Sequence, residues 1–256
     1  MPEPSHANPH PAARRSGPQP GPRGQAAQPG TPPGGQQSAA HPDQALADAL
    51  LARWTALFAA PEAEPYGEQL LRRWSEPQRR YHTVRHLAAT LSVIDRLAGH
   101  AEDADLVRAA AWFHDAIYAP DRSENEERSA RLAERVLPEL GVSDEAVAEV
   151  ARLVRLTAAH DPAPGDHNGE VLCDADLAVL GSPPQIYAGY AAAVRAEYAF
   201  VPDEDFRNGR ADVLERLLAL PSLYRTQLAR SAYAERAAMN MRTELARLRD
   251  RVPPVT

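Results

Sequence analysis

Apolar residues recur at the spacing of an α-helix along most of the chain after residue 42. The first apolar face is made of Leu46, Leu50, Trp54, Leu57 and Phe58. Asp43 precedes this face and is expected to be the N-cap residue of the helix. A second short helix is expected over residues 66–76, because Pro77 follows it.

The same periodicity predicts further helices toward the C-terminal end. One includes the run of residues 81–86 and ends near Gly99. Ser123, with Glu126 three residues later, predicts a capping box, and Ser143 is expected to cap the next helix. The remaining expected helices cover residues 106–118, 123–140, 143–160, 171–180, 184–200, 203–219 and 222–248. Since no stretch shows a convincing period of two, the predicted fold class is all-α.

Residues 1–42 differ from the rest, because they contain Pro, Gly, Gln, Ser and Ala but almost no large apolar side chain. Such a segment cannot bury enough apolar surface to offset the entropy of ordering it. We therefore expect a disordered tail over residues 1–42 and one folded domain over residues 43–250. That length is sufficient for a sizeable core.

Charge and cysteine content narrow the expected partners and location. The net charge of −7 and the pI near 5.7 argue against attraction to nucleic acid or to an anionic membrane. The single cysteine, Cys173, favours a reducing compartment. No apolar run approaches the ~20 residues that cross a bilayer, and no secretion signal is recognisable. We therefore expect a cytoplasmic protein. Its amphipathic C-terminal helix could pack on the domain or pair with a second subunit.

Histidine and aspartate residues interrupt the apolar helical pattern at four places. His82 and His86 are four residues apart at a helix start, so their side chains should share a face. The alternative is a surface histidine pair. His114 and Asp115 follow two aromatic residues inside the helix expected over residues 106–118. The alternative here is a surface aspartate beside a histidine of the core.

The other two places are an aspartate pair and a histidine. Asp174 and Asp176 lie in an otherwise apolar segment, where a carboxylate is costly to desolvate unless a cation meets it. A capping aspartate and a solvated one would be the alternative. His160 stands at the end of an apolar helix, where it could instead bond the last carbonyl groups.

Taken together, these residues offer imidazole and carboxylate groups to one cation. Such a mixed ligand set suits Mn, Fe, Co, Ni or Zn better than Ca. A structural zinc site of the cysteine type is excluded, because Cys173 is the only thiol. The sequence predicts one divalent metal ion and does not distinguish among these metals or Mg.

The order of His86, His114-Asp115 and Asp176 resembles the H…HD…D signature of the HD superfamily of phosphohydrolases. That superfamily includes cyclic nucleotide phosphodiesterases, guanosine tetraphosphate hydrolases and nucleotidases. More narrowly, roughly residues 45–235 are similar to a bacterial family of predicted metal-dependent HD phosphohydrolases. The matching positions are residues 81–86 and 112–118, Asn125, Glu126, Ser129, Ala130, Thr157, His160 and residues 174–181.

The resemblance implies an HD-domain helical bundle with a defined set of metal ligands. The implied ligands are His86, His114, Asp115 and Asp176. Asp174 is a rival to Asp176, because spacing alone does not decide between them. No further histidine follows closely after the doublet, which favours one ion over two. A second ion would need Glu126 or His160 as a ligand.

The resemblance also implies hydrolysis of a phosphate ester or anhydride in a nucleotide or another small phosphorylated molecule. His82 has the position of a general acid, and Asp115 is expected to orient or deprotonate the attacking water. The residues expected to bind the substrate are Arg85, Arg195, Arg210 and His160. No nucleic acid or membrane partner is expected, and an oligomer is possible. The alternatives are a non-catalytic binding module and a di-iron oxygenase of the HD type.

Overall fold

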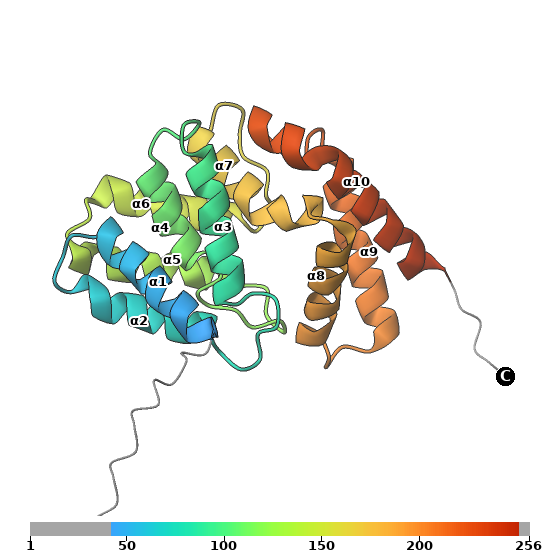
Figure 1. The fold of residues 1–256 in the computed structure, drawn as a ribbon, viewed down its shortest axis with the longest axis horizontal. Coiled ribbons are helices and arrows are strands. Elements are labelled where there is room, and N and C mark those ends of the chain that lie inside the picture. The colour runs from blue at the N-terminus through green and yellow to red at the C-terminus, as the bar shows by residue number, and fades with distance from the viewer. Residues whose placement is uncertain (1–41, 251–256) are drawn as a thin grey trace, which may run out of the picture. The chain divides into compact units, whose positions relative to one another are not determined.

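The computed structural model describes residues 42–250, and all regular structure within that range is helical (Figure 1). The predicted all-α fold class is confirmed. The elements are α1 (Pro42–Leu57), α2 (Ala63–Trp74), α3 (Val84–Leu97), α4 (Ala104–Phe113), α5 (Asn125–Val136), η1 (Leu137–Leu140), α6 (Asp144–Leu156), α7 (His167–Asp176), η2 (Leu177–Gly181), α8 (Pro184–Glu197), α9 (Asp203–Ala219) and α10 (Gln227–Arg249). The predicted disordered tail lies outside the described residues, except that Pro42 begins α1 and so places Asp43 inside the helix.

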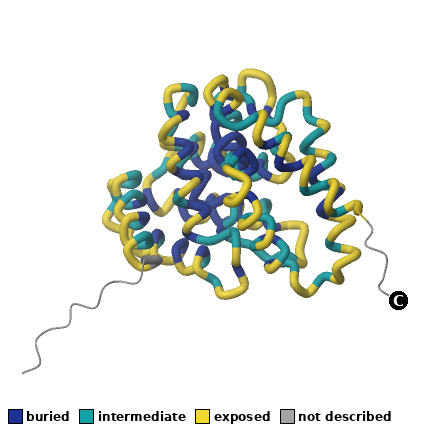
Figure 2. The backbone as a smooth tube through the Cα atoms, turned by 45° about the vertical axis from the view of Figure 1, so that its right-hand side comes forward, coloured by how far each residue is buried: buried dark blue, intermediate teal, exposed yellow. Residues whose placement is uncertain are grey.

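Helices α1 to α7 surround a densely packed core, which the dark blue segments of Figure 2 mark. α3 packs on α1, α4 and α7, and α4 also contacts α5 and α6. Trp54, Trp74 and Trp112 are at most 1 % exposed. The indole N–H of Trp74 donates to the carbonyl of Trp112 at 3.0 Å, which satisfies its polar atom inside the core. The core therefore fixes α3, α4 and α7 relative to one another.

The helix ends around the predicted site differ from the sequence-based expectation. The side chain of Thr83 accepts a hydrogen bond from the backbone N–H of Arg85, so α3 begins at Val84 and His82 lies before it. α4 ends at Phe113, five residues short of the predicted end. The predictions that His82 shares a helix with His86, and that the doublet at residues 114–115 lies inside a helix, are therefore wrong. The start of α3 and the end of α4 thus lie next to the side chains of His82, His114 and Asp115.

The irregular segment between α4 and α5 is held by two polar side chains of α5. The hydroxyl of Ser129 bonds both backbone groups of Ile117, and the amide of Asn125 bonds those of Ala119. Because α5 begins at Asn125, the capping box predicted at residues 123–126 does not form. Asn125 and Ser129, two of the positions that carry the family resemblance, thus support this segment from α5.

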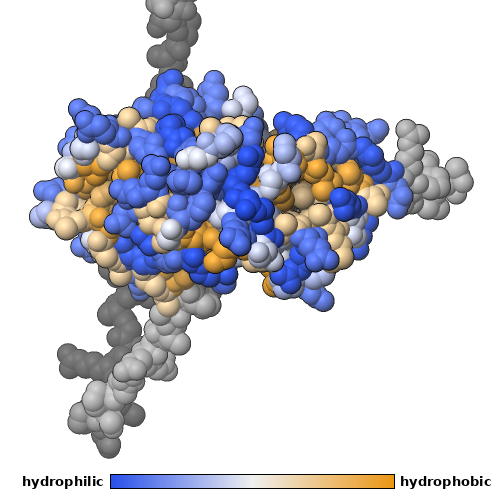
Figure 3. All heavy atoms as spheres, turned by 90° about the horizontal axis from the view of Figure 1, so that it is seen from above, coloured by the Kyte–Doolittle hydropathy of each residue, from blue (hydrophilic) through white to orange (hydrophobic). Residues whose placement is uncertain are grey.

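Helices α8, α9 and α10 form a second, less buried group beside the core (Figure 1). α10 packs on α9 and η2, so this C-terminal helix contacts its own domain. The large apolar side chains that are at least half exposed in the described range are Ile186, Phe200, Leu228 and Met239. Seen from above, apolar side chains form separate patches among hydrophilic ones (Figure 3). Within residues 42–250, no helix has both the length and the apolar composition needed to cross a bilayer.

Candidate metal centre

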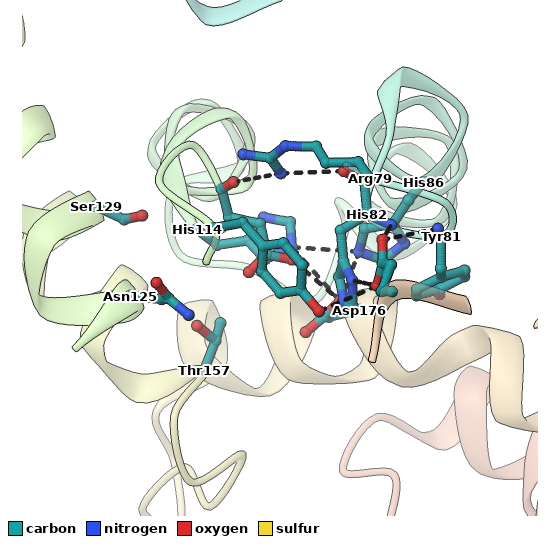
Figure 4. A network of polar contacts seen from close by, with 12 residues as sticks. Arg79, Tyr81, His82, His86, His114, Asn125, Ser129, Thr157 and Asp176 are labelled. Atoms are coloured by element: carbon teal, nitrogen blue, oxygen red, sulfur yellow. Dashed lines mark hydrogen bonds and ion pairs between the residues drawn. The ribbon is translucent and has the colours of Figure 1, made fainter. Parts of the chain in front are cut away.

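The structure brings together the four side chains predicted to bind metal, and Figure 4 labels three of them, His86, His114 and Asp176. His86 lies in the first turn of α3, His114 and Asp115 directly follow α4, and Asp176 is the last residue of α7. Nε2 of His86 lies 3.0 Å from Oδ1 of Asp176 and 3.3 Å from Nε2 of His114. Nε2 of His114 lies 3.3 Å from Oδ2 of Asp115 and 3.5 Å from Oδ1 of Asp176. Three segments distant in sequence therefore direct nitrogen and oxygen donors toward one point.

These distances fit a transition-metal ion. Zinc lies about 2.0–2.2 Å from nitrogen and oxygen ligands, so donors of a tetrahedral or octahedral site lie about 3.0–3.5 Å apart. Nδ1 of His114 lies 2.8 Å from the carbonyl oxygen of Ala111. That contact holds the proton on Nδ1 and leaves the lone pair of Nε2 directed at the other donors. The histidine and carboxylate groups of His86, His114 and Asp115 are thus within metal-binding distance of one another.

The electrostatics of the cluster also favour a cation. Burial would raise the pKa of Asp115 and Asp176, but the neighbouring histidines, His114 foremost, lower both below the usual range. Burial lowers the pKa of His86, which favours its neutral form. Burial would lower the pKa of His114 as well, but the two carboxylates raise it well above its usual value. The negative charge of Asp115 and Asp176, which favours a proton on His114, would also attract a divalent ion. Because that proton and the ion compete for His114, the ion would bind less tightly at low pH.

Asp174, the sequence-based rival of Asp176, is directed elsewhere. Its side chain is fully buried, and its two oxygens accept hydrogen bonds from the backbone N–H groups of Arg225 and Thr226, each at 2.7 Å. These bonds hold the turn that leads into α10. Asp174 therefore has a structural role, and the geometry favours Asp176 as the ligand.

His82 lies beside the four donors and is held by a residue that the sequence interpretation missed. Nδ1 of His82 lies 2.7 Å from Oε2 of Glu197, and Nε2 lies 3.9 Å from Oδ2 of Asp115. The other oxygen of Glu197 accepts the backbone N–H groups of residues 80–82 at 2.8–3.0 Å. The hydroxyl of Tyr118 also donates to Glu197, at 3.0 Å. Glu197, at the end of α8, therefore fixes both the ring and the backbone of His82.

The protonation of this pair follows from its burial and charge. Burial would lower the pKa of His82, but the carboxylates of Asp115 and Glu197 raise it above the usual value. Burial would raise the pKa of Glu197, but its bonds to His82 and to backbone N–H groups lower it to about 2. His82 therefore favours the doubly protonated ring, in which Nε2 can donate. The only signal of Glu197 in the sequence was one acidic residue in an alanine-rich stretch.

Arg79 is a second residue that the sequence did not identify. It is 3 % exposed, and its guanidinium donates to the carbonyl groups of His82, Asp115 and Ala116 at 3.0, 2.8 and 3.3 Å. The same group lies 5.4 Å from the centre of the Trp74 ring. Arg79 therefore ties the segment before α3 to the segment after α4. In the sequence it stands in a polar stretch after Pro77 that resembles an exposed turn.

His160 reaches the cluster from beyond the end of α6. The helix ends at Leu156, four residues before the predicted end, and His160 adopts a left-handed backbone with φ of 52°. Its Nε2 lies 2.7 Å from Oδ2 of Asp176. His160 therefore orients the carboxylate whose other oxygen faces His86 and His114. A role in capping its own helix, which the sequence left open, does not fit this position.

A cavity of about 500 Å³ opens beside the cluster. The residues that line it are His82, His114, Asp115, Tyr118, Glu126, Thr157, His160, Asp176, Tyr190, Val194, Tyr198, Val201, Asp205, Phe206, Gly209, Arg210 and Val213. Arg210 is the one arginine among these lining residues. Its guanidinium donates to both carboxylate oxygens of Glu244, at 2.9 and 3.1 Å, and to the hydroxyl of Tyr190 at 3.1 Å. Arg210 and three tyrosines thus line the same cavity as His114, Asp115 and Asp176.

The two other arginines predicted to bind substrate lie outside this cavity. Arg195 donates to the carbonyls of Tyr198 and Val201 and to the carboxylate of Asp203, so it holds the connection from α8 to α9. The prediction for Arg195 is therefore not supported by its placement. Arg85 lines a neighbouring cavity of about 540 Å³, which also touches His86 and Asp176 and contains three further arginines.

Comparisons of the chain with protein-family models, with curated proteins and with solved structures find no match.

Proposed function

We propose that this chain is a metal-dependent phosphohydrolase that cleaves an ester or anhydride bond in a nucleotide or another small phosphorylated molecule. The observation that carries the proposal is the gathering of four donors beside His82, three of which, His114, Asp115 and Asp176, line a cavity. The order of these residues in the sequence, which resembles that of the HD superfamily, adds to it.

His86, His114, Asp115 and Asp176 would hold the divalent ion. When bound, such an ion polarises a phosphoryl oxygen and lowers the pKa of water toward neutrality. Asp115 faces both His114 and His82, so its carboxylate can orient the attacking water and accept its proton. The proposal thus gives Asp115 a role in binding and in proton transfer.

His82 supplies the acid. Because Glu197 engages Nδ1, the remaining ring nitrogen Nε2 is the one that faces the cluster. The carboxylates of Asp115 and Glu197 raise the pKa of His82, which favours a proton on the ring for transfer to the leaving oxygen. Glu197 acts through His82, as a positioning residue.

The walls of the cavity would bind the rest of the substrate. Arg210 offers a cation to phosphoryl oxygens, and its two-point contact with Glu244 fixes its direction. The volume of about 500 Å³ suits a small molecule. The tyrosines Tyr118, Tyr190 and Tyr198 provide aromatic surface for an organic group of the substrate.

The test is a screen of nucleotides, nucleoside oligophosphates and small phosphoesters with Mn, Co, Ni, Fe, Mg and Zn. We expect at least one substrate to release phosphate with one of these metals, and Asp115→Ala to abolish the release. His82→Ala should keep the metal and lose turnover. Metal binding without hydrolysis of any compound would instead favour a non-catalytic module, and two irons per chain would favour the oxygenase alternative.

A further inference from the structure

A second group of histidine and carboxylate side chains lies at the other end of the helix pair that carries the first. His100 follows the end of α3, and His167 and Glu170 lie in the first turn of α7. α3 and α7 pack on each other, with His86 near the start of α3 and Asp176 at the end of α7. The two helices are therefore antiparallel.

The donor atoms of this second group are already within reach of one ion. Nδ1 of His167 lies 3.3 Å from Nε2 of His100 and 3.3 Å from Oε2 of Glu170. Nε2 of His100 lies 2.6 Å from the same carboxylate oxygen. The two 3.3 Å separations match those of a tetrahedral ion with bonds of about 2.0–2.1 Å. If the distance between Nε2 of His100 and Oε2 of Glu170 increased to a similar value, all three donors could bind one ion.

Solvent access and ligand type define which ion would fit. The side chains of His100, His167 and Glu170 are 35 %, 45 % and 13 % exposed, so an ion can reach them and water can fill a fourth position. Two imidazoles and one carboxylate favour Zn, Ni or Co over Mg or Ca. The rings of the two histidines are nearly perpendicular, with centres 4.8 Å apart, so they meet at their nitrogens and do not stack.

We infer that His100, His167 and Glu170 form a separate site for a transition-metal ion of the zinc type, which clamps α3 to α7. The part of α3 from His86 to its end at Leu97 already spans about 17 Å, and His100 lies beyond it, so the two ions would not share ligands. A hydrogen bond of 2.9 Å from the backbone N–H of Asp103 to the side chain of Asn168 already joins the same helix ends. An ion there would hold the register of α3 against α7, on which the contact of His86 with Asp176 depends.

The test uses Zn²⁺ and the full chain in an Asp176→Asn background, which removes a ligand of the first cluster. We expect this variant to bind Zn²⁺ and to melt about 5–10 °C higher when the ion is at 100 times its Kd. The matched control, Asp176→Asn with His100→Gln, keeps His86, His114 and Asp115, so it should bind about one ion fewer and lose the zinc-dependent rise in melting temperature. Zinc held by the tail histidines His6, His10 and His41 would be common to both proteins and cancels in the comparison.

His167→Gln serves as a second variant, because His167 is the most exposed of the three side chains and its change threatens the fold least. Circular dichroism of each zinc-free protein checks that it folds. Equal zinc binding with and without His100 would overturn the inference, as would a melting temperature that does not respond to Zn²⁺. Neither outcome bears on hydrolysis, so failure here is distinguishable from failure of the proposed function.

Discussion

The helices of the core and the helices of the C-terminal group differ in how they are packed. In α4 six of ten residues are buried, including the unbroken run Ala109 to Phe113. In α10 only four of 23 residues are buried, and α8 and α9 bury three each. All four predicted metal ligands come from the core, whereas α8 and α9 supply Tyr190, Phe206, Gly209 and Arg210 to the cavity.

This difference separates two requirements of the proposed site. Donors for a metal must be held to within a fraction of an ångström, which a packed core provides. A cavity wall that meets a substrate gains from adjustable surfaces. Glu197 connects the C-terminal group to the core. It is the last residue of α8, and its carboxylate accepts hydrogen bonds from the backbone just before α3.

The largest expected effect comes from changing a donor of the core. Asp176→Asn should prevent tight metal binding at the cluster of His86, His114 and Asp115 and lower kcat/KM by about 10³-fold or more. The matched variant Asp174→Asn, two residues earlier, should keep the metal. Its single amide oxygen can accept from only one of the N–H groups of Arg225 and Thr226, so Tm should fall by about 2–10 °C. Metal content and thermal melting measure both; a metal-free Asp174→Asn protein with an intact fold would reverse the assignment.

The next effect concerns the residue that joins the two parts. Glu197→Gln should lower kcat about 10–100-fold with little change in metal content, because it disturbs the orientation and charge of His82 without touching a ligand. The acid limb of the pH–rate profile should shift with it, since the carboxylate raises the pKa of His82. A kcat equal to that of the unchanged protein would remove Glu197 from the mechanism.

The same pair predicts a pH dependence of stability. Glu197 has a folded pKa of about 2 against about 4.3 when unfolded, so it contributes about 3 kcal/mol above pH 4.5 that is lost toward pH 2. His82 has a raised pKa, so its contribution is present below about pH 6.5 and is lost as the pH rises through the folded value. Denaturant unfolding at a series of pH values should show both slopes, and Glu197→Gln should flatten them. Identical profiles would contradict the assignment.

The smallest expected effects are changes in stability when a methyl group is added to a core helix or to a helix of the C-terminal group. A Cβ atom added at Gly67 on α2 would lie 2.4 Å from a ring carbon of Trp54, so Gly67→Ala should destabilise the fold by about 1–3 kcal/mol. At Gly189 on α8 no atom lies within 4 Å, so Gly189→Ala should stabilise it by about 0.5–1 kcal/mol. Opposite shifts of Tm would support the contrast between the two parts, and equal shifts would remove it.

What the sequence determined by itself was the helical class and a short set of candidate ligands, in which Asp174 and Asp176 remained rivals. Helical periodicity is a local property, so it placed most helices, although their ends moved where caps such as Thr83 and side-chain bonds such as those of Asn125 intervened. The unusual cost of carboxylates among apolar residues marked Asp115 and Asp176 before their geometry was known.

Only the tertiary structure decided between Asp174 and Asp176, because the two differ in what packs beside them and not in spacing. It also revealed Glu197, whose partner His82 is 115 residues away. The sequence likewise did not indicate that Arg195 would bond the carbonyl groups of Tyr198 and Val201. A charged side chain in a sequence gives no sign of which distant backbone groups it will meet, since that depends on how whole helices pack.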